Sequence, residues 1–201
     1  MLKVLVGCEF SGVVRDAFLA AGHDAISCDL LPTDSQGPHM ACDVMEAVLS
    51  QKWDIIILHP PCTALAVSGN STYGYGCKKH DLRLVAVTWT KKLFDTALCQ
   101  AVVGVALENP VGVLPRMAGM ECSQYIHPWM FGHMEQKKTG LWLHNLPPLV
   151  PTNDVYKDML QLPKSDRERI HYMPPSKDRW KMRSITYQGI ADAMASQWGG
   201  L

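Results

Sequence analysis

Three side chains with the potential for covalent chemistry follow two apolar runs of the sequence. Cys62 comes shortly after the run 53–58, and Glu108 and Asn109 directly follow the run 101–107. A thiolate can add to an electron-poor heterocycle, while a neighbouring carboxylic acid and amide stabilise the charge that develops on the ring. The sequence therefore predicts a nucleophilic site formed by Cys62, Glu108 and Asn109.

The two prolines before Cys62 favour a fixed presentation of its thiol. Pro60 and Pro61 each restrict φ and lack a backbone donor, so the chain leaves the preceding strand stiffly. If the runs 53–58 and 101–107 are neighbouring parallel strands, their carboxyl ends meet where open α/β sheets bind ligands. The alternative is that Cys62 is one more small buried side chain and Glu108 a carboxylate at the end of a loop.

Cytosine is a ring that this chemistry would suit. Addition of a thiolate at C6 turns C5 into an enamine-like carbon, which can attack a methyl donor. A carboxylic acid at N3 would neutralise the developing charge, and we expect burial to raise the pKa of Glu108 and keep it protonated. A cytosine within a duplex would have to swing out of the stack to reach such a site.

Apolar runs alternate with segments of helical periodicity, which predicts an α/β fold with a doubly wound, mostly parallel sheet. The expected strands are 2–7, 23–29, a brief piece at 41–44, 53–58, 101–107 and a strand near 131–132 and 139–143. The expected helices are 13–21, 45–51, 81–99 and 189–197. We expect residues 63–80 to form a long mobile loop that closes over the site, and the proline-rich segment 147–182 to be mostly loop.

The first strand, the loop 8–12 and the acid Asp29 about 20 residues further on form the general layout of a nucleoside-cofactor site. The loop lacks the GxGxxG pattern that admits a pyrophosphate, so a cofactor without phosphates fits better. Asp29 would accept hydrogen bonds from both ribose hydroxyls, and Asp43 or the adjacent backbone would meet an adenine amino group. Alternatively, Asp29 caps a loop and Asp43 caps the next helix.

The bulk composition is that of one globular domain. The chain has 201 residues, of which 47% are hydrophobic and 19% charged, and its formal net charge is 0, so no overall field attracts a polyanion. Seven cysteines without a CxxC pair favour reduced thiols and a cytoplasmic protein. We expect neither a signal peptide nor a membrane span, and the sequence does not predict an oligomeric state.

These motifs together resemble the DNA cytosine C5-methyltransferase family, in particular its short, phage-type members. Phe10-Ser11-Gly12 is similar to the family's Phe-Ala-Gly loop, Cys42-Asp43-Val44 to its Gly-Asp-Ile segment, Pro60-Pro61-Cys62 to its nucleophile loop, and Glu108-Asn109 to its Glu-Asn-Val segment. The resemblance covers most of the chain, in the family's order.

The resemblance implies a Rossmann-like methyltransferase fold that uses S-adenosylmethionine, in the host cytoplasm if the protein is phage-encoded. Cys62 would attack C6 of a cytosine in DNA, Glu108 would engage N3, and the methyl group would go to C5. The cofactor would be held by Phe10, Ser11, Gly12, Asp29, Asp43 and Pro60.

The chain departs from the family pattern near its phosphate and base contacts. The family's Gln-x-Arg-x-Arg segment aligns with Glu135, Lys137 and Thr139, so both arginines are lost, although Lys137 and Lys138 keep positive charge. His59 stands where the family has Gly, and Thr63 where it has Gln.

The family's target-recognition domain is also reduced. We expect one catalytic domain over 1–201, with 147–182 as a short target-recognition or loop segment. The range 157–183 has eight Lys or Arg against four Asp or Glu. It would allow a few phosphate contacts and only weak or short sequence specificity, unless it is simply a solvated loop. The expected contacts to double- or single-stranded DNA are Lys137, Lys138, Arg179, Lys181 and Arg183.

Three alternatives remain open at this point. The protein could be an inactive, methyltransferase-like regulator that binds nucleic acid or cofactor. It could be an enzyme that acts on single-stranded DNA or on a free cytosine nucleotide. Cys77, His80, Cys122 and His127 also have spacings that a tetrahedral zinc site would admit.

Overall fold

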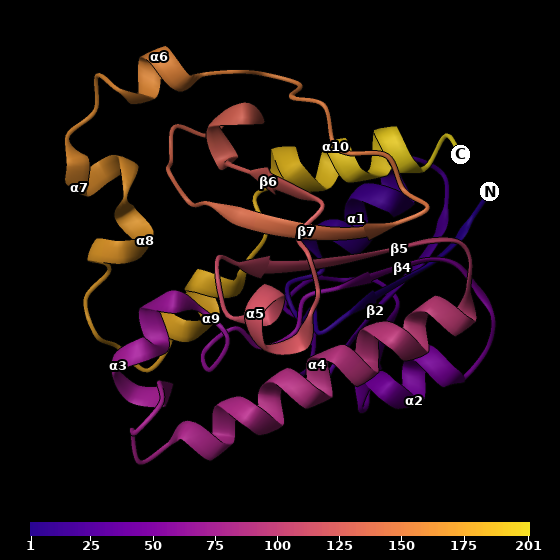
Figure 1. The fold of residues 1–201 in the computed structure, drawn as a ribbon. Coiled ribbons are helices and arrows are strands. Elements are labelled where there is room, and N and C mark those ends of the chain that lie inside the picture. Colours follow the sequence, from indigo (N-terminus) through magenta and orange to yellow (C-terminus); the bar gives the residue numbers. More distant parts are fainter.

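The computed structural model describes all 201 residues and contains one seven-stranded sheet with the order β3-β2-β1-β4-β5-β7-β6 (Figure 1). The strands are β1 (Lys3–Gly7), β2 (Asp24–Asp29), β3 (His39–Ala41), β4 (Trp53–Leu58), β5 (Ala101–Pro110), β6 (Gln124–Ile126) and β7 (Thr139–His144). All pairs from β3 across to β5 are parallel, whereas β7 is antiparallel to both β5 and β6. The predicted doubly wound, mostly parallel α/β fold of the Rossmann-like type is confirmed.

The register of the central strands aligns their carboxyl ends. Gly7 of β1 pairs with Leu58 of β4, and Leu58 pairs with Leu107 of β5. The next residues in the chain after Gly7, Leu58 and Leu107 are Cys8, His59 and Glu108. These next residues therefore lie in a row along the same edge of the sheet. This alignment brings segments that are about 50 residues apart in the chain to one place.

Helices cover both faces of the sheet. They are α1 (Val13–Ala20), α2 (Val44–Leu49), α4 (His80–Gln100) and α10 (Gln188–Trp198), together with the five-residue α5 (Leu114–Ala118). Figure 1 shows α1 and α10 on one face and α2 and α4 on the other. Side chains of β1 alternate between the two faces, so Val4 and Val6 pack with the α1 and α10 cluster while Leu5 packs with the α2 and α4 cluster. Each face has its own apolar core.

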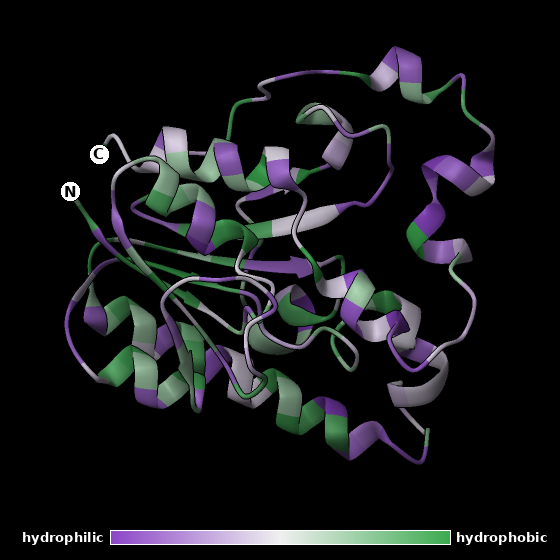
Figure 2. Cartoon of the chain, turned by 180° about the vertical axis from the view of Figure 1, so that it is seen from behind, coloured by the Kyte–Doolittle hydropathy of each residue, from purple (hydrophilic) through white to green (hydrophobic).

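The remaining helices are short and lie in the segments between and after the strands. They are η1 (Val67–Gly69), α3 (Asn70–Tyr73), η2 (Pro128–Met130), α6 (Tyr156–Met159), α7 (Lys164–Arg167), α8 (Arg169–Tyr172) and α9 (Arg179–Ser184). In Figure 1, α3, α8 and α9 lie beyond the head of the β5 arrow. Figure 2 shows α6, α7 and α8 as mostly hydrophilic, in contrast to the hydrophobic central strands. No helix is both long and apolar enough to cross a membrane.

Several sequence predictions about individual elements need correction. The brief extended piece is His39–Ala41 rather than 41–44. Residues 131–132 are not part of a strand, and the three-residue strand β6 was not predicted. The segment 147–182 is mostly loop as expected, but it includes the short helices α6, α7 and α8 and the first four residues of α9, which ends at Ser184.

The expected mobile loop at 63–80 is also wrong in its first half. This part contains η1 and α3, and it pairs with the segment after β5 through a bridge between Ala66 and Gly112. The backbone N–H of Val67 donates to Val111 O (3.0 Å) and that of Val113 to Leu65 O (2.9 Å). The chain after Cys62 is therefore fixed to a neighbouring segment.

Candidate active site

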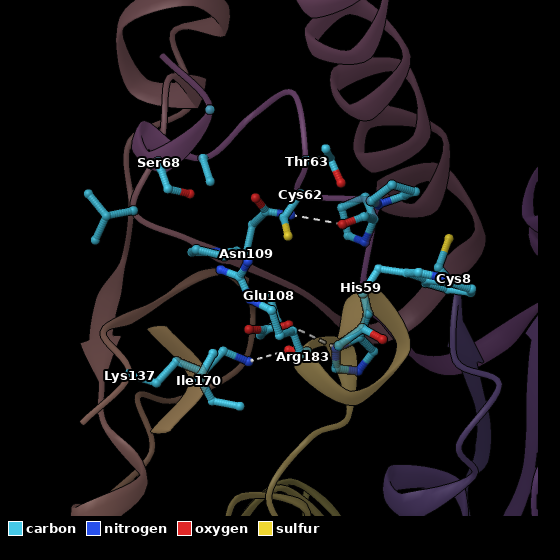
Figure 3. A pocket seen from close by; sticks show the side chains of 18 of the residues that line it. Cys8, His59, Cys62, Thr63, Ser68, Glu108, Asn109, Lys137, Ile170 and Arg183 are labelled. Atoms are coloured by element: carbon cyan, nitrogen blue, oxygen red, sulfur yellow. Dashed lines mark hydrogen bonds and ion pairs between the residues drawn. The ribbon is translucent and has the colours of Figure 1, made fainter. Parts of the chain in front are cut away.

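A cavity of about 650 Å³ opens at the carboxyl edge of the sheet. Its walls come from the loop after β1, the turn after β4, the end of β5 and the segments 66–73, 137–138 and 170–186. Cys62, Glu108 and Asn109 all line it, so the structure brings together the three residues that the sequence singled out. Figure 3 shows the sulfur of Cys62 on the same side of the cavity as Glu108 and Asn109.

Cys62 lies where the chain turns away from β4. Pro60 is buried and Pro61 exposed, and the carbonyl of Cys62 accepts hydrogen bonds from Leu65 N (2.9 Å) and Ala66 N (2.8 Å). Burial raises the pKa of the Cys62 thiol, and the negative charge of Glu108 raises it further, whereas Lys137 and Arg183 oppose the rise. The resting side chain is therefore a thiol, and its ionisation depends on the charges around it.

Glu108 does not have the raised pKa that the sequence led us to expect. Burial acts to raise the pKa of Glu108, but a hydrogen bond from His59 and the positive charge of Lys137 outweigh it, so the pKa is lowered. His59 Nδ1 donates to Glu108 Oε2 over 3.1 Å, and both side chains are largely buried. Glu108 is therefore an ionised, hydrogen-bonded carboxylate near neutral pH.

Asn109 connects the end of β5 to the turn that precedes Cys62. Its Nδ2 donates to Pro60 O over 2.9 Å, and the residue is almost fully buried. Its Oδ1 is buried without a hydrogen-bond partner. Asn109 thereby fixes the backbone just before Cys62 and leaves one acceptor free at a residue that lines the cavity.

Arg83 holds the other side of the turn and was not predicted from the sequence. Its buried guanidinium donates to Ala64 O (2.7 Å), to Asn70 Oδ1 (2.8 Å) and to Ala66 O (3.4 Å). Arg83 belongs to the first turn of α4, about 20 residues after Cys62, and no periodicity in the sequence marks it out.

The loop after β1 contributes Cys8, Glu9, Phe10 and Ser11 to the cavity wall. Glu9 Oε1 accepts from Val14 N (2.7 Å) and its Oε2 from Arg15 N (3.3 Å). The carboxylate of Glu9 therefore occupies the N-terminus of α1, the place where dinucleotide-binding folds hold a phosphate. Any cofactor at this loop has to bind without a phosphate on that helix.

Of the other residues expected at the cofactor, Pro60 lines the cavity whereas Gly12, Asp29 and Asp43 do not. Gly12 has a φ of 76° at the N-terminus of α1, which suits glycine. Asp29 Oδ1 accepts from Leu31 N (3.0 Å), and Asp43 Oδ1 accepts from Met45 N (2.7 Å) as the cap of α2. Both acids thus make the local bonds that the capping interpretation describes.

The charges of Asp29 and Asp43 nevertheless act on the cavity wall. Burial raises the pKa of the Cys8 thiol, and both carboxylates raise it further. A negative potential at Cys8 favours a positively charged ligand on this side of the cavity.

The predicted basic residues divide into two groups. Lys137, Lys138 and Arg183 line the cavity, and Lys137 Nζ donates to Arg183 O over 3.3 Å. Arg179 and Lys181 do not line it, and Lys181 Nζ instead pairs with Asp34 Oδ1 at 2.7 Å.

Helix α9 covers the Phe10 side of the cavity. The rings of Trp180 and Phe10 meet edge to face with centroids 6.2 Å apart, and Lys181 Nζ lies 4.9 Å from the centre of the Phe10 ring. The sequence suggested charge and aromatic content for this segment but not this contact, which joins residues far apart in the chain.

The zinc alternative finds no support in the structure. No group of three or more His, Cys, Asp or Glu side chains is arranged to hold a metal ion. Cys77 donates instead to backbone carbonyls of Asn70 and Ser71, and Cys122 to those of Gln124 and Leu141. All seven cysteines are free thiols.

No protein-family profile and no curated protein sequence matches the chain. Three similar solved structures are described as methyltransferases. An E. coli protein described as a DNA modification methyltransferase encoded within a prophage has 13% identity and a TM-score of 0.41, with 71% of this chain and 46% of that chain covered. The Entamoeba histolytica methyltransferase EhMeth has 11% identity and a TM-score of 0.49, with 77% and 57% covered.

The S. pombe Dnmt2 methyltransferase has 10% identity and a TM-score of 0.44, with 88% of this chain and 61% of that chain covered. The chain thus spans about half to three fifths of the length of these proteins. At TM-scores below 0.5, none of these similarities assigns an activity or a residue role to this chain.

Proposed function

We propose that this protein transfers a methyl group from S-adenosylmethionine to C5 of cytosine in DNA, through a covalent bond between Cys62 and C6. One observation carries the proposal. A thiol, a carboxylate and an amide from the ends of two adjacent parallel strands line one cavity, together with the loop after β1. The motif resemblance agrees with this arrangement.

The loop after β1 fits a sulfonium cofactor better than a dinucleotide. Glu9 already occupies the N-terminus of α1, and Asp29 and Asp43 give this side of the cavity a negative potential. S-adenosylmethionine has no phosphate and bears a positive charge next to the methyl group that it supplies. Phe10, Ser11, Gly12 and Pro60 would hold it, with Asp29 and Asp43 as hydrogen-bond acceptors for its ribose and adenine.

Cys62 is the nucleophile of the proposed reaction. Its thiolate adds to C6 of the base, which makes C5 electron-rich enough to accept the methyl group. Lys137 and Arg183 favour the thiolate, whereas burial and Glu108 oppose it. A base that engages the Glu108 carboxylate would weaken the negative charge that opposes the thiolate.

Glu108 and Asn109 recognise the base. A carboxylate can accept from the exocyclic amino group of cytosine, and Asn109 fixes the turn that presents Cys62. The ring must leave the duplex stack to reach the cavity. Lys137, Lys138 and Arg183 at the cavity, with Arg179 and Lys181 on the nearby α9, would contact phosphates of the strand.

The whole chain would act as a single catalytic domain, with 147–182 as a reduced target-recognition segment. Four short helices with an excess of basic residues give little surface for reading base edges. We therefore propose weak or short sequence specificity.

A label-transfer experiment tests the proposal. The protein is incubated with S-adenosylmethionine tritiated on its methyl group and with duplex DNA, single-stranded DNA or free cytosine nucleotide in separate reactions. Acid-stable label in DNA is expected for the wild type and for Cys99→Ala, an exposed cysteine on α4, but not for Cys62→Ala.

The separate substrates distinguish the alternatives. Label in the free nucleotide alone would replace DNA as the substrate. Absence of label from every substrate would contradict the enzymatic proposal and favour a regulator. Equal labelling by wild type and Cys62→Ala would contradict the covalent mechanism.

A further inference from the structure

His59 faces the cavity with one ring nitrogen bonded and the other free. Its Nδ1 donates to Glu108 Oε2 (3.1 Å), while its Nε2 is buried and has no hydrogen-bond partner (Figure 3). The backbone N–H of His59 donates to Gly7 O (2.9 Å), which fixes the residue at the edge of the sheet between β1 and β5. Buried polar atoms are seldom left unpaired, so the unpaired Nε2 indicates a partner supplied from the cavity.

The bond from His59 changes what Glu108 can do. Burial alone would raise the pKa of Glu108, but the hydrogen bond from His59, with the charge of Lys137, lowers it. A resting carboxylate cannot give a proton to the ring nitrogen on which negative charge develops during addition. The proton has to come from a group that is connected to Glu108, and His59 is the side chain bonded to it.

We propose that His59 is a positioning residue that holds, through Glu108, the proton taken by N3 of the cytosine when Cys62 adds to C6. This inference rests on the proposed function and deepens it. It also gives a role to His59, which stands where the cytosine C5-methyltransferase family has Gly before the two prolines.

The proposed addition begins with the Cys62 thiolate, whose proton has gone to water. A sulfur lone pair forms the Sγ–C6 bond. The C5=C6 pair moves to C4=C5, and the C4=N3 pair takes a proton at N3 from the carboxyl of Glu108. That proton reaches Glu108 beforehand, because Nε2 of His59 accepts a proton from water while Nδ1 passes its own proton to the carboxylate.

The reverse movement completes the cycle. After C5 has been methylated and has lost its proton to water, the Sγ–C6 bond breaks with its electron pair returning to sulfur. N3 then returns its proton to Glu108 and His59. The free Nε2 gives the imidazole a second contact with the cavity, through which it can be protonated again.

Other charges act on the same pair and must be considered in any pH experiment. Lys137 lowers the pKa of Glu108, and Lys137 and Arg183 act on Cys62 in the same direction. Cys62 and Glu108 also influence each other, because the carboxylate raises the pKa of the thiol. Lys137, Arg183 and Cys62 make no hydrogen bond to Glu108, whereas His59 does.

The first test does not depend on methyl transfer. The carboxyl carbon of Glu108 is followed by NMR against pH in the wild type, His59→Ala and His59→Asn. We expect it to titrate below the ordinary range of glutamate in the wild type and at a higher pH in His59→Ala, where only the charge of Lys137 still opposes burial. His59→Asn keeps an N–H donor and should stay near the wild type.

The second test compares single-turnover methylation rates. Loss of a general acid lowers rates by about 100-fold to 10,000-fold. His59→Asn keeps Glu108 ionised without a proton source, so we expect a rate at least about 100-fold below the wild type. His59→Ala lets Glu108 hold its own proton, so its rate should exceed that of His59→Asn and fall with rising pH as Glu108 ionises. His144→Asn, at the exposed end of β7, should match the wild type.

The order of the two variants separates proton supply from structural support. If His59 only supports the fold, the conservative His59→Asn is the milder change, and that order would overturn the inference. A Glu108 titration that is the same in wild type and His59→Ala would also overturn it. If the wild type methylates nothing while Glu108 titrates as expected, the proposed function fails but the His59 to Glu108 bond stands.

Discussion

Replacement of Arg83 by Met should loosen the turn that presents Cys62. The guanidinium of Arg83 is buried and donates to Ala64 O, Asn70 Oδ1 and Ala66 O, with no carboxylate paired to it. Met keeps most of the apolar stem in place and removes the donors together with their positive charge. The change therefore measures the contribution of three charge-assisted hydrogen bonds.

These three bonds differ in value. A hydrogen bond to a charged group contributes about 1.5–3 kcal/mol, so three at full value would give about 6 kcal/mol. However, Ala66 O also accepts from Gly69 N (3.0 Å), and Asn70 is exposed, so water can replace the donor there. The bond to Ala64 O at 2.7 Å accounts for most of the loss. We expect Arg83→Met to cost about 2 kcal/mol.

Hydrogen exchange tests this value locally. The amide of Val67 bonds to Val111 O across the turn, so it should exchange about 30-fold faster in Arg83→Met if opening is favoured by about 2 kcal/mol. Arg116→Met, which changes an exposed arginine on α5, serves as the control and should leave the rate unchanged. Equal exchange at Val67 in both variants would refute the role given to Arg83.

Three further predictions follow from single contacts. Glu9→Ala should lower the free energy of unfolding in urea by about 1–2 kcal/mol, because two N–H groups of α1 lose their acceptor; no loss would contradict the cap. Because the pKa of Glu108 is lowered in the folded protein, its stabilisation is complete above the ordinary glutamate range and disappears as pH falls through the folded value. The difference in unfolding free energy between wild type and Glu108→Gln should therefore shrink in acid, and a constant difference would contradict it. Trp180→Ala should speed tryptic cleavage in α9 a few-fold, since an edge-to-face pair contributes about 0.5–1.5 kcal/mol, and unchanged cleavage would show that the contact with Phe10 does not hold the helix.

The central strands and the meeting of Cys62 with Glu108 could be predicted because the signal is local. Residues 55–58 form an unbroken apolar run that is fully buried on both faces, as in other parallel sheets. The run before Cys62 is followed by Pro60, which cannot continue a strand, whereas β5 continues beyond its apolar run to Pro110. Register and topology then place the two ends side by side.

The contacts that decide the electrostatics of the site could not be predicted, because they join residues far apart in the chain. The pKa of Glu108 depends on His59, which is 49 positions away, and burial alone suggested the opposite shift. The sequence marked His59 as a departure from the family motif but gave no partner for it. The same holds for Arg83, whose acceptors are backbone carbonyls that no sequence pattern identifies.

Short elements were the other source of error. β6 has three residues and α6 to α9 have four to six each, too few to show a period of two or 3.6. Their conformation depends on tertiary contacts such as those of Lys181 with Asp34 and Phe10. Asp43 is a contrasting case, because its capping bond to Met45 is local and was among the sequence interpretations.

Trapping the covalent complex tests the central claim most directly. In 5-fluorocytosine, fluorine replaces the hydrogen that must leave C5 after methylation. DNA that contains this base should therefore remain bonded to the protein in the presence of S-adenosylmethionine. Peptide mapping by mass spectrometry should then find the nucleotide on Cys62 and on no other cysteine. An adduct on a different cysteine, or efficient cytosine methylation without any adduct, would contradict the account.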